Sequence, residues 1–168
     1  MLTKKQRLEQ YGITTDGQIL GAISRCCDIL GNGKNKAAKV FIEKICRHES
    51  HFGTYPDSSK KYGEGLSQFD KISFDDVVAR TKDKHIKTVL KYYGFNIKEM
   101  DYEELRHNLS LQIVMTRLKL KLIPDVFPVD DDGQWEYYKK YWNTESGKAT
   151  REKWDKDTVG KCYFSVGE

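Results

Sequence analysis

The sequence predicts a mainly α-helical protein, because apolar residues recur at intervals of three and four along most of its length. The segment from Asn108 to Ile123 is apolar around most of a helical circumference, which is typical of a buried central helix. Only the glycine- and serine-rich segment from His51 to Asp70 suggests a loop or a small β-hairpin. The chain has 168 residues and shows no linker or repeat, so residues 1–168 are expected to form one domain.

The first half of the chain predicts three helices. A short polar helix near the N-terminus is followed by one that starts after the N-cap oxygens of residues 14–16 and ends at Gly31-Asn32-Gly33. Its apolar face consists of Ile19, Leu20, Ile23, Cys26, Cys27 and Leu30. A further helix is predicted from Asn35, and its C-terminal end carries Glu49, so this carboxyl group is anchored to a rigid element.

The second half predicts more helices around the central one. Ser73 is expected to cap a helix through Val77 and Val78, another helix runs through residues 86–90, and Asp101 caps a short one. Pro124 and Pro128 end the central helix. An acidic turn at residues 130–133 is then followed by the aromatic segment WEYYKKYWNT, which opens the last long helix.

The composition argues against nucleic acid as a partner. The chain has 29 basic and 25 acidic residues, and the resulting charge of +4 is spread along the sequence. The N-terminal MLTKKQRLEQ lacks the apolar run of a signal peptide, and no segment reaches transmembrane length. We therefore expect a monomer that is made in the cytoplasm and needs help to leave it.

Metal ions and cofactors are not expected. The cysteines at positions 26, 27, 46 and 162 have neither C-x-x-C spacing nor the density of a disulfide scaffold, and they are interpreted as reduced thiols. Zinc is the competing interpretation of the segment RHESH, because Cys46, His48, Glu49 and His51 carry possible ligands. The spacing, however, misses the i, i+4 histidine pair of H-E-x-x-H.

Glu49 is the candidate catalytic residue. It lies where apolar helix packing gives way to a polar segment rich in turns, and such a carboxyl group can act as a general acid. The alternative is a solvated surface glutamate. Ser50 and the pair Ser67-Gln68 supply polar groups, and Gly63 and Gly65 permit close approach of the backbone to a ligand.

Two motifs carry a resemblance to a known family. E-S-H-x-G at residues 49–53, followed by G-x-G-L-x-Q-x-D at residues 63–70, resembles the signature of goose-type lysozymes, and soluble lytic transglycosylases share its E-S and G-L-x-Q elements. Asn108-Leu109 is similar to the central-helix motif of the family, and Trp142-Asn143-Thr144 near Gly147 is similar to its Tyr-Asn-Ala-Gly element. The overall pattern looks most like phage-encoded members.

This resemblance implies a lysozyme-like fold and cleavage of the β-1,4 bond between N-acetylmuramic acid and N-acetylglucosamine in peptidoglycan, with Glu49 as the acid. Asp70 stands where goose-type lysozymes carry an aspartate that helps to hold water, and Asp57 falls in the region of another, which favours a muramidase. The alternatives are a turn residue for Asp57 and a helix cap for Asp70. Glu64 matches no carboxylate of the family.

Peptidoglycan, the expected substrate, requires aromatic faces and amides along the cleft. Gln68 and Asn143 match motif positions whose amides approach the glycan in the family, and aromatic candidates are Tyr62, Tyr92, Tyr138, Tyr141 and Trp142. The remaining predicted substrate-binding residues are Ser50, Gly65 and Ser67. The aromatic residues at helical spacing could equally belong to the core. Because Trp142 replaces the motif tyrosine, Tyr141 is the candidate for the phenol that braces Glu49.

Two classes of function remain open at this point. The first is a muralytic enzyme, either a muramidase or a lytic transglycosylase that leaves 1,6-anhydro ends. The second is a non-catalytic glycan-binding or virion protein of the same fold. The presence of Glu49 favours the enzyme, acting either as a phage lysis enzyme released by a holin or as a virion component that opens the wall.

Overall fold

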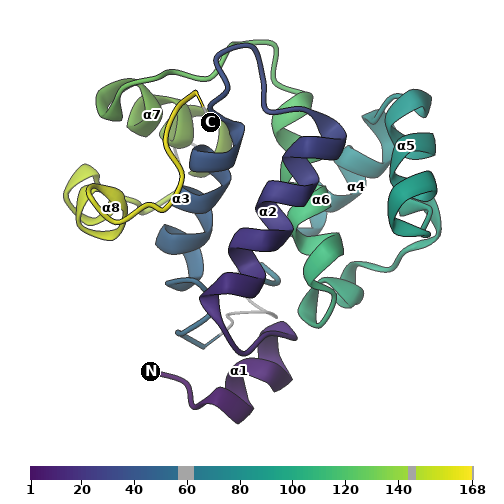
Figure 1. Ribbon diagram of the computed structural model, residues 1–168, viewed down its shortest axis with the longest axis horizontal. Helices are drawn as coiled ribbons and strands as arrows, with labels where there is room; N and C mark the ends of the chain where they lie inside the picture. Colours follow the sequence, from purple (N-terminus) through teal and green to yellow (C-terminus); the bar gives the residue numbers. More distant parts are fainter. Residues whose placement is uncertain (57–62, 144–146, 168) are drawn as a thin grey trace.

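The computed structural model describes residues 1–56, 63–143 and 147–167. The prediction of a mainly α-helical protein is confirmed (Figure 1). The α-helices of the described residues are α1 (Lys4–Tyr11), α2 (Asp16–Leu30), α3 (Ala38–Ser50), α4 (Lys71–Arg80), α5 (Asp83–Tyr93), α6 (Leu109–Lys121), α7 (Asp131–Tyr138) and α8 (Arg151–Thr158). Two short 3-10 helices, η1 (Ile97–Glu99) and η2 (Tyr102–Arg106), precede α6, and a π-helical turn, η3 (Lys139–Asn143), continues α7.

The helices pack around α2, α3 and α6. Helix α6 contacts α2, α3, α4 and η2, and α3 contacts α2 and α8 (Figure 1). Their apolar side chains form a buried cluster that includes Ile23, Phe41, Ile45, Val114 and Leu118. Helix α3 is thus held on several sides, which fixes the position of its C-terminal residue Glu49.

Helix α6 is the buried central helix that the sequence predicts. Its N-cap is Asn108, whose Oδ1 accepts a hydrogen bond from the Leu111 amide over 3.0 Å. Its buried polar side chains have partners: the Thr116 hydroxyl donates to the Gln112 carbonyl over 2.7 Å, and Arg117 Nε donates to the Gly31 carbonyl over 2.8 Å. These bonds offset the desolvation of polar groups inside the core.

The described residues of the segment after α3, 51–56 and 63–70, consist of turns with one antiparallel bridge. Glu64 and Phe69 exchange two backbone hydrogen bonds of 2.9 Å each, and this pair is an isolated bridge within the described residues. The described residues therefore show the loop expected between His51 and Asp70, and within them its β-character is limited to this one pair.

Two predicted helix starts are wrong. The helix expected from Asn35 begins at Ala38, because residues 33–36 form a turn that the Lys36 amide closes onto the Gly33 carbonyl over 3.1 Å. The cap expected at Ser73 is instead Asp70, whose Oδ1 accepts a hydrogen bond from the Ser73 amide over 2.6 Å. Ser73 therefore lies in the first turn of α4.

The C-terminal part also differs from the prediction. The acidic residues 130–132, together with Gly133, form the cap and first turn of α7. Asp130 Oδ1 accepts a hydrogen bond from the Gly133 amide, and acidic side chains are favourable at a helix N-terminus. The helix that begins there is followed by α8, a short helix of 8 residues that the sequence did not predict. In the part of the chain that the structure describes, no helix is both long enough and apolar enough to span a bilayer.

Candidate active site

Glu49 lies in the last turn of α3, and its side chain is partly buried. The Tyr138 hydroxyl donates a hydrogen bond of 2.5 Å to Glu49 Oε1. Burial raises the pKa of Glu49 to about 7, whereas the Tyr138 hydrogen bond and the charges of Lys119 and Lys153 act in the opposite direction. A carboxyl group with this pKa is partly protonated at neutral pH, as a general acid must be.

The turn after Glu49 has an uncommon backbone conformation. His51, Phe52 and Gly53 follow one another with φ values of 48°, 58° and 70°. The left-handed conformation is unfavourable for His and Phe, so the surrounding contacts must stabilise it. Ser50 supplies one of them, because its buried Oγ accepts a hydrogen bond from the Gly53 amide over 3.0 Å. Ser50, predicted to bind substrate, therefore supports the turn that ends α3.

The phenol that contacts Glu49 belongs to Tyr138, so the prediction of Tyr141 for this role is wrong. The Tyr141 hydroxyl instead donates to the carboxylate of Asp125. The reason lies in the local helix geometry: α7 ends at Tyr138, and the wider turn of η3 changes the direction of the side chains that follow. Helical spacing alone cannot indicate such a change.

Tyr138 is held firmly in place. Its buried ring stacks on that of Trp154, with ring centres 4.3 Å apart and planes at 23°. Asn143 forms a hydrogen bond with the Tyr138 side chain, and Asn143 Oδ1 accepts a hydrogen bond from Lys139 Nζ over 2.7 Å. Asn143 is therefore linked to Glu49 through the Tyr138 hydroxyl, and its side chain is partly buried.

Lys119 of α6 adds a positive charge to the site. Its Nζ lies 4.1 Å from the centre of the Trp142 ring and donates a hydrogen bond of 3.0 Å to Ser73 Oγ. Burial lowers the pKa of Lys119, and the carboxylates of Asp70 and Glu49 oppose that effect. Lys119 thus interacts electrostatically with the candidate acid and with Asp70, beside a partly buried aromatic ring.

The loop that begins at Gly63 is fastened to α6. The Leu66 amide donates a hydrogen bond of 2.8 Å to Gln112 Oε1. Gly65, with a φ of 74°, lies so close to the same side chain that a Cβ would come within 2.7 Å of Gln112 Oε1. Glycine is therefore needed here for the approach of the loop to the central helix, whereas the sequence suggested an approach to a ligand.

Ser67 and Gln68 are placed by the same loop. The buried Ser67 hydroxyl is hydrogen-bonded to that of Thr116 over 2.9 Å. Gln68 has a φ of 49°, and its Nε2 donates to the Gly65 carbonyl over 2.8 Å. Ser67 thus contacts α6, whereas Gln68 is partly buried and lies nearer the surface.

The carboxylates considered besides Glu49 have different positions. Asp70 is exposed and caps α4, as the alternative interpretation expected. Glu64 is buried and accepts hydrogen bonds from both Nε and Nη2 of Arg106, at 2.9 to 3.1 Å. Asp57 and Tyr62 lie outside the described residues.

The possible zinc ligands are engaged in other contacts. His48 Nδ1 lies 2.9 Å from Asp157 Oδ2, and the ring of His51 stacks on that of Tyr55 with centres 3.8 Å apart. Cys46 is buried, and burial raises the pKa of its thiol. Among the residues that the structure describes, no three His, Cys, Asp or Glu side chains are arranged to hold a metal ion.

The structure brings together Glu49, Trp142 and Asn143 from the predicted site, and it adds two residues with roles that the sequence did not indicate. Tyr138 was a candidate for sugar binding and instead contacts the acid. Nothing in the sequence indicates that Lys119 lies near the candidate acid, because a lysine in an apolar helix is typically a surface residue. Comparisons with protein-family models, with curated proteins and with solved structures give no match for this chain.

Proposed function

We propose that this protein is a glycosidase that cleaves the β-1,4 bond between N-acetylmuramic acid and N-acetylglucosamine in peptidoglycan, with Glu49 as the general acid. The observation that carries the proposal is the Glu49 carboxyl group, which is partly buried, has a pKa raised to about 7 and accepts a hydrogen bond from Tyr138. A glycosidic oxygen is a poor leaving group until it is protonated, so the enzyme needs a carboxyl group that keeps its proton near neutral pH.

The surroundings of Glu49 suit both halves of such a proton transfer. Burial keeps the carboxyl group protonated before the reaction. Once the proton has moved to the leaving oxygen, the Tyr138 hydroxyl and the positive charges of Lys119 and Lys153 stabilise the carboxylate. The partly buried Gln68 and Trp142 are the proposed contacts with the glycan.

Hydrolysis and transglycosylation differ in the second step. A muramidase uses a second carboxylate to place water, and Asp70 is the candidate that the sequence offers. The hydrogen bond between Asp70 Oδ1 and the Ser73 amide favours the second candidate function, a lytic transglycosylase, because it gives Asp70 a structural role. In that reaction the 6-hydroxyl of muramic acid attacks the anomeric carbon, and 1,6-anhydro ends form.

The proposed enzyme is a phage muralytic protein that acts as a monomer on the wall in the periplasm. It reaches the wall either after release by a holin or as part of the virion. A non-catalytic glycan-binding protein of the same fold would not need a carboxyl group with a raised pKa, and Glu49 therefore favours an enzyme.

The test is digestion of purified peptidoglycan, with mass spectrometry of the new ends. Reducing ends are expected for a muramidase and 1,6-anhydro ends for a transglycosylase. Glu49→Gln should lower the rate by at least about a hundredfold, because general acid catalysis contributes that much or more. Glu136→Gln, an exposed position on α7, is the matched control and should keep full activity. Walls left intact by the folded wild-type protein would contradict the proposal.

A further inference from the structure

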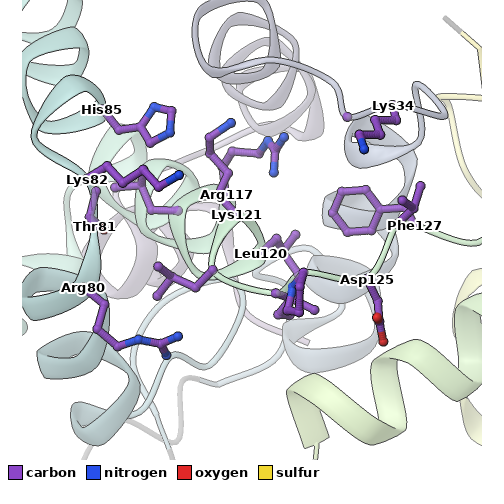
Figure 2. A pocket seen from close by; sticks show the side chains of 16 residues that line it. Lys34, Arg80, Thr81, Lys82, His85, Arg117, Leu120, Lys121, Asp125 and Phe127 are labelled. Atoms are coloured by element: carbon purple, nitrogen blue, oxygen red, sulfur yellow. The ribbon is translucent and has the colours of Figure 1, made fainter.

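A cavity of about 610 Å³ lies away from Glu49, at the C-terminal end of α6 (Figure 2). Its walls come from the end of α4, the start of α5, the last turns of α6 and residues 122–127. Its volume falls within the range of small-molecule sites, which is roughly 300 to 1,000 Å³. Neither Glu49 nor Tyr138, Lys119 or Asn143 lines it, so it is separate from the candidate active site.

Basic side chains dominate the polar lining of this cavity, whose described residues include one carboxylate, that of Asp125. Asp76, outside the lining, pairs with Arg80 over 2.9 Å. The basic residues are Lys34, Arg80, Lys82, His85, Arg117 and Lys121. Figure 2 shows the side chains of His85, Lys82, Arg117 and Lys121 gathered on one side of it. Such an arrangement is suited to an anion with more than one negative charge.

The inner part of the basic wall is held in position by the fold. Arg117 is buried, and its Nε donates a hydrogen bond of 2.8 Å to the Gly31 carbonyl. Lys121 Nζ donates a hydrogen bond of 2.9 Å to the Leu30 carbonyl. Both bonds use carbonyls at the C-terminal end of α2, so the two positive charges are fixed before any ligand arrives.

The pKa of His85 reflects the positive charge around the cavity. Burial lowers the pKa of His85, and the positive charges of Lys121, Lys84, Lys82 and Arg117 lower it further. The main charges that act on the imidazole are therefore cationic, and they come from the start of α5 and from α6. An anion bound between these helices would offset this effect.

The floor of the cavity is apolar. Its accessible apolar residues are Leu122 and Ile123, which are partly buried, and Val126, which has 45% of its surface exposed, whereas the lining residues Leu118, Leu120 and Phe127 are almost fully buried. A small inorganic ion would leave this apolar surface unused. The lining therefore matches a ligand that joins an anionic group to an apolar part.

We propose that this cavity is a binding site for a phosphate monoester with an apolar substituent. A dianionic phosphoryl group can pair with the basic residues of α4, α5 and α6, and the apolar substituent contacts Leu122 and Val126. A carboxylate, with one negative charge, would neutralise fewer of these cations. The site does not depend on the proposed glycosidase activity.

The test is calorimetric titration of the full-length protein with phenyl phosphate and with inorganic phosphate at low ionic strength. Phenyl phosphate should bind at least threefold more tightly, because its ring buries apolar surface. The double variant Arg80→Gln/Lys82→Gln should weaken binding of phenyl phosphate at least tenfold. Both positions are exposed, so the variant is expected to fold.

The matched control is Lys4→Gln/Lys5→Gln, which removes the same charge from exposed positions on α1 and should change affinity less than twofold. An independent readout is the pKa of the His85 imidazole, followed by NMR, which should rise when phenyl phosphate binds. Equal weakening by both double variants, an unchanged His85 pKa at saturation, or absence of binding to the wild-type protein would overturn the proposal. Equal affinity for the two phosphates would overturn the role of the apolar floor.

Discussion

At the scale of single residues, Glu49 is subject to opposing influences. Burial favours the neutral acid, whereas Tyr138, Lys119 and Lys153 favour the carboxylate. The balance leaves its pKa at about 7, close to the pH at which a general acid is most effective. Each of these neighbours can be removed by a single substitution, so its contribution to the pKa of Glu49 can be measured.

Tyr138→Phe removes the hydroxyl that donates to Glu49 Oε1. Since this hydrogen bond lowers the pKa of Glu49, its loss should raise that pKa by about one unit, in line with the strength of hydrogen bonds to charged groups. The general acid must be protonated, so the alkaline limb of the pH–rate profile should move to higher pH by the same amount. Tyr141→Phe is the control, because Tyr141 contacts Asp125. A limb that stays in place in Tyr138→Phe would show that the two groups are not coupled.

Glu49 should also lower the stability of the folded protein at alkaline pH. Its folded pKa of about 7 lies above the ordinary glutamate value of 4.5, so the folded state binds this proton more tightly than the unfolded state does. This contribution is complete below pH 4.5 and is lost as the pH rises to about 7. The loss corresponds to about 2 to 3 kcal/mol, allowing for the partial exposure of the side chain.

Glu49→Gln cannot ionise and should avoid this loss. We expect the variant to be about 2 to 3 kcal/mol more stable than the wild type at pH 8 and nearly equal to it at pH 4. Urea unfolding at the two pH values measures the difference, and Glu136→Gln serves as the control. A variant less stable than the wild type at pH 8 would mean that the Glu49 carboxylate is well accommodated in the fold.

At the scale of elements, the loop around residues 63–70 joins α4 and α6 at the site. The sequence groups Glu49, Gly65 and Gln68 because they are close along the chain. The structure shows that this loop packs on α6 through the hydrogen bond between the Leu66 amide and Gln112. The contact between Tyr138 and Glu49 could not be predicted, because it joins residues 89 positions apart. Several tyrosines of the aromatic segment are equal candidates for the phenol that contacts Glu49. The choice depends on the change from α7 to η3, which sets the directions of their side chains.

The two interpretations of Asp70 can be separated by substitution. Serine is also a good N-cap, so Asp70→Ser should keep α4 stable, whereas Asp70→Ala should cost about 1 kcal/mol in urea unfolding. If Asp70 is only a cap, both variants should digest peptidoglycan at the wild-type rate under conditions where they are folded. A loss of hydrolysis in Asp70→Ser, with stability kept, would assign the carboxylate a role in placing water.

At the scale of the whole molecule, local signals predicted more than long-range packing did. Helices α2 and α6 were predicted because their caps and apolar periodicity lie within the segments themselves. Helix α8 was missed because it is mostly polar and depends on distant partners: Trp154 packs on Tyr138, and Asp157 contacts His48 on α3. These contacts place α8 directly behind the candidate acid, so its position matters for the site.

The buried cysteines offer a measure of the stability of this packing. Burial raises the pKa of Cys26 to about 12 and that of Cys27 to about 11, and it raises the pKa of Cys46 as well. Since the thiolate is the reactive form, these three thiols should react with an aromatic disulfide reagent at pH 8 only when the fold opens. The experiment uses Cys162→Ser, which removes the partly exposed thiol.

In that background, three thiols should react slowly in buffer and rapidly in urea. Adding Glu49→Gln should slow the reaction in buffer at pH 8 by about tenfold or more, because an increase of 1.4 kcal/mol in stability lowers the unfolded fraction tenfold. Glu136→Gln should leave the rate unchanged. The opposing outcome is fast reaction of one thiol in buffer, at a rate that Glu49→Gln does not change. That result would show that one helix opens locally and that its opening does not depend on the stability of the site.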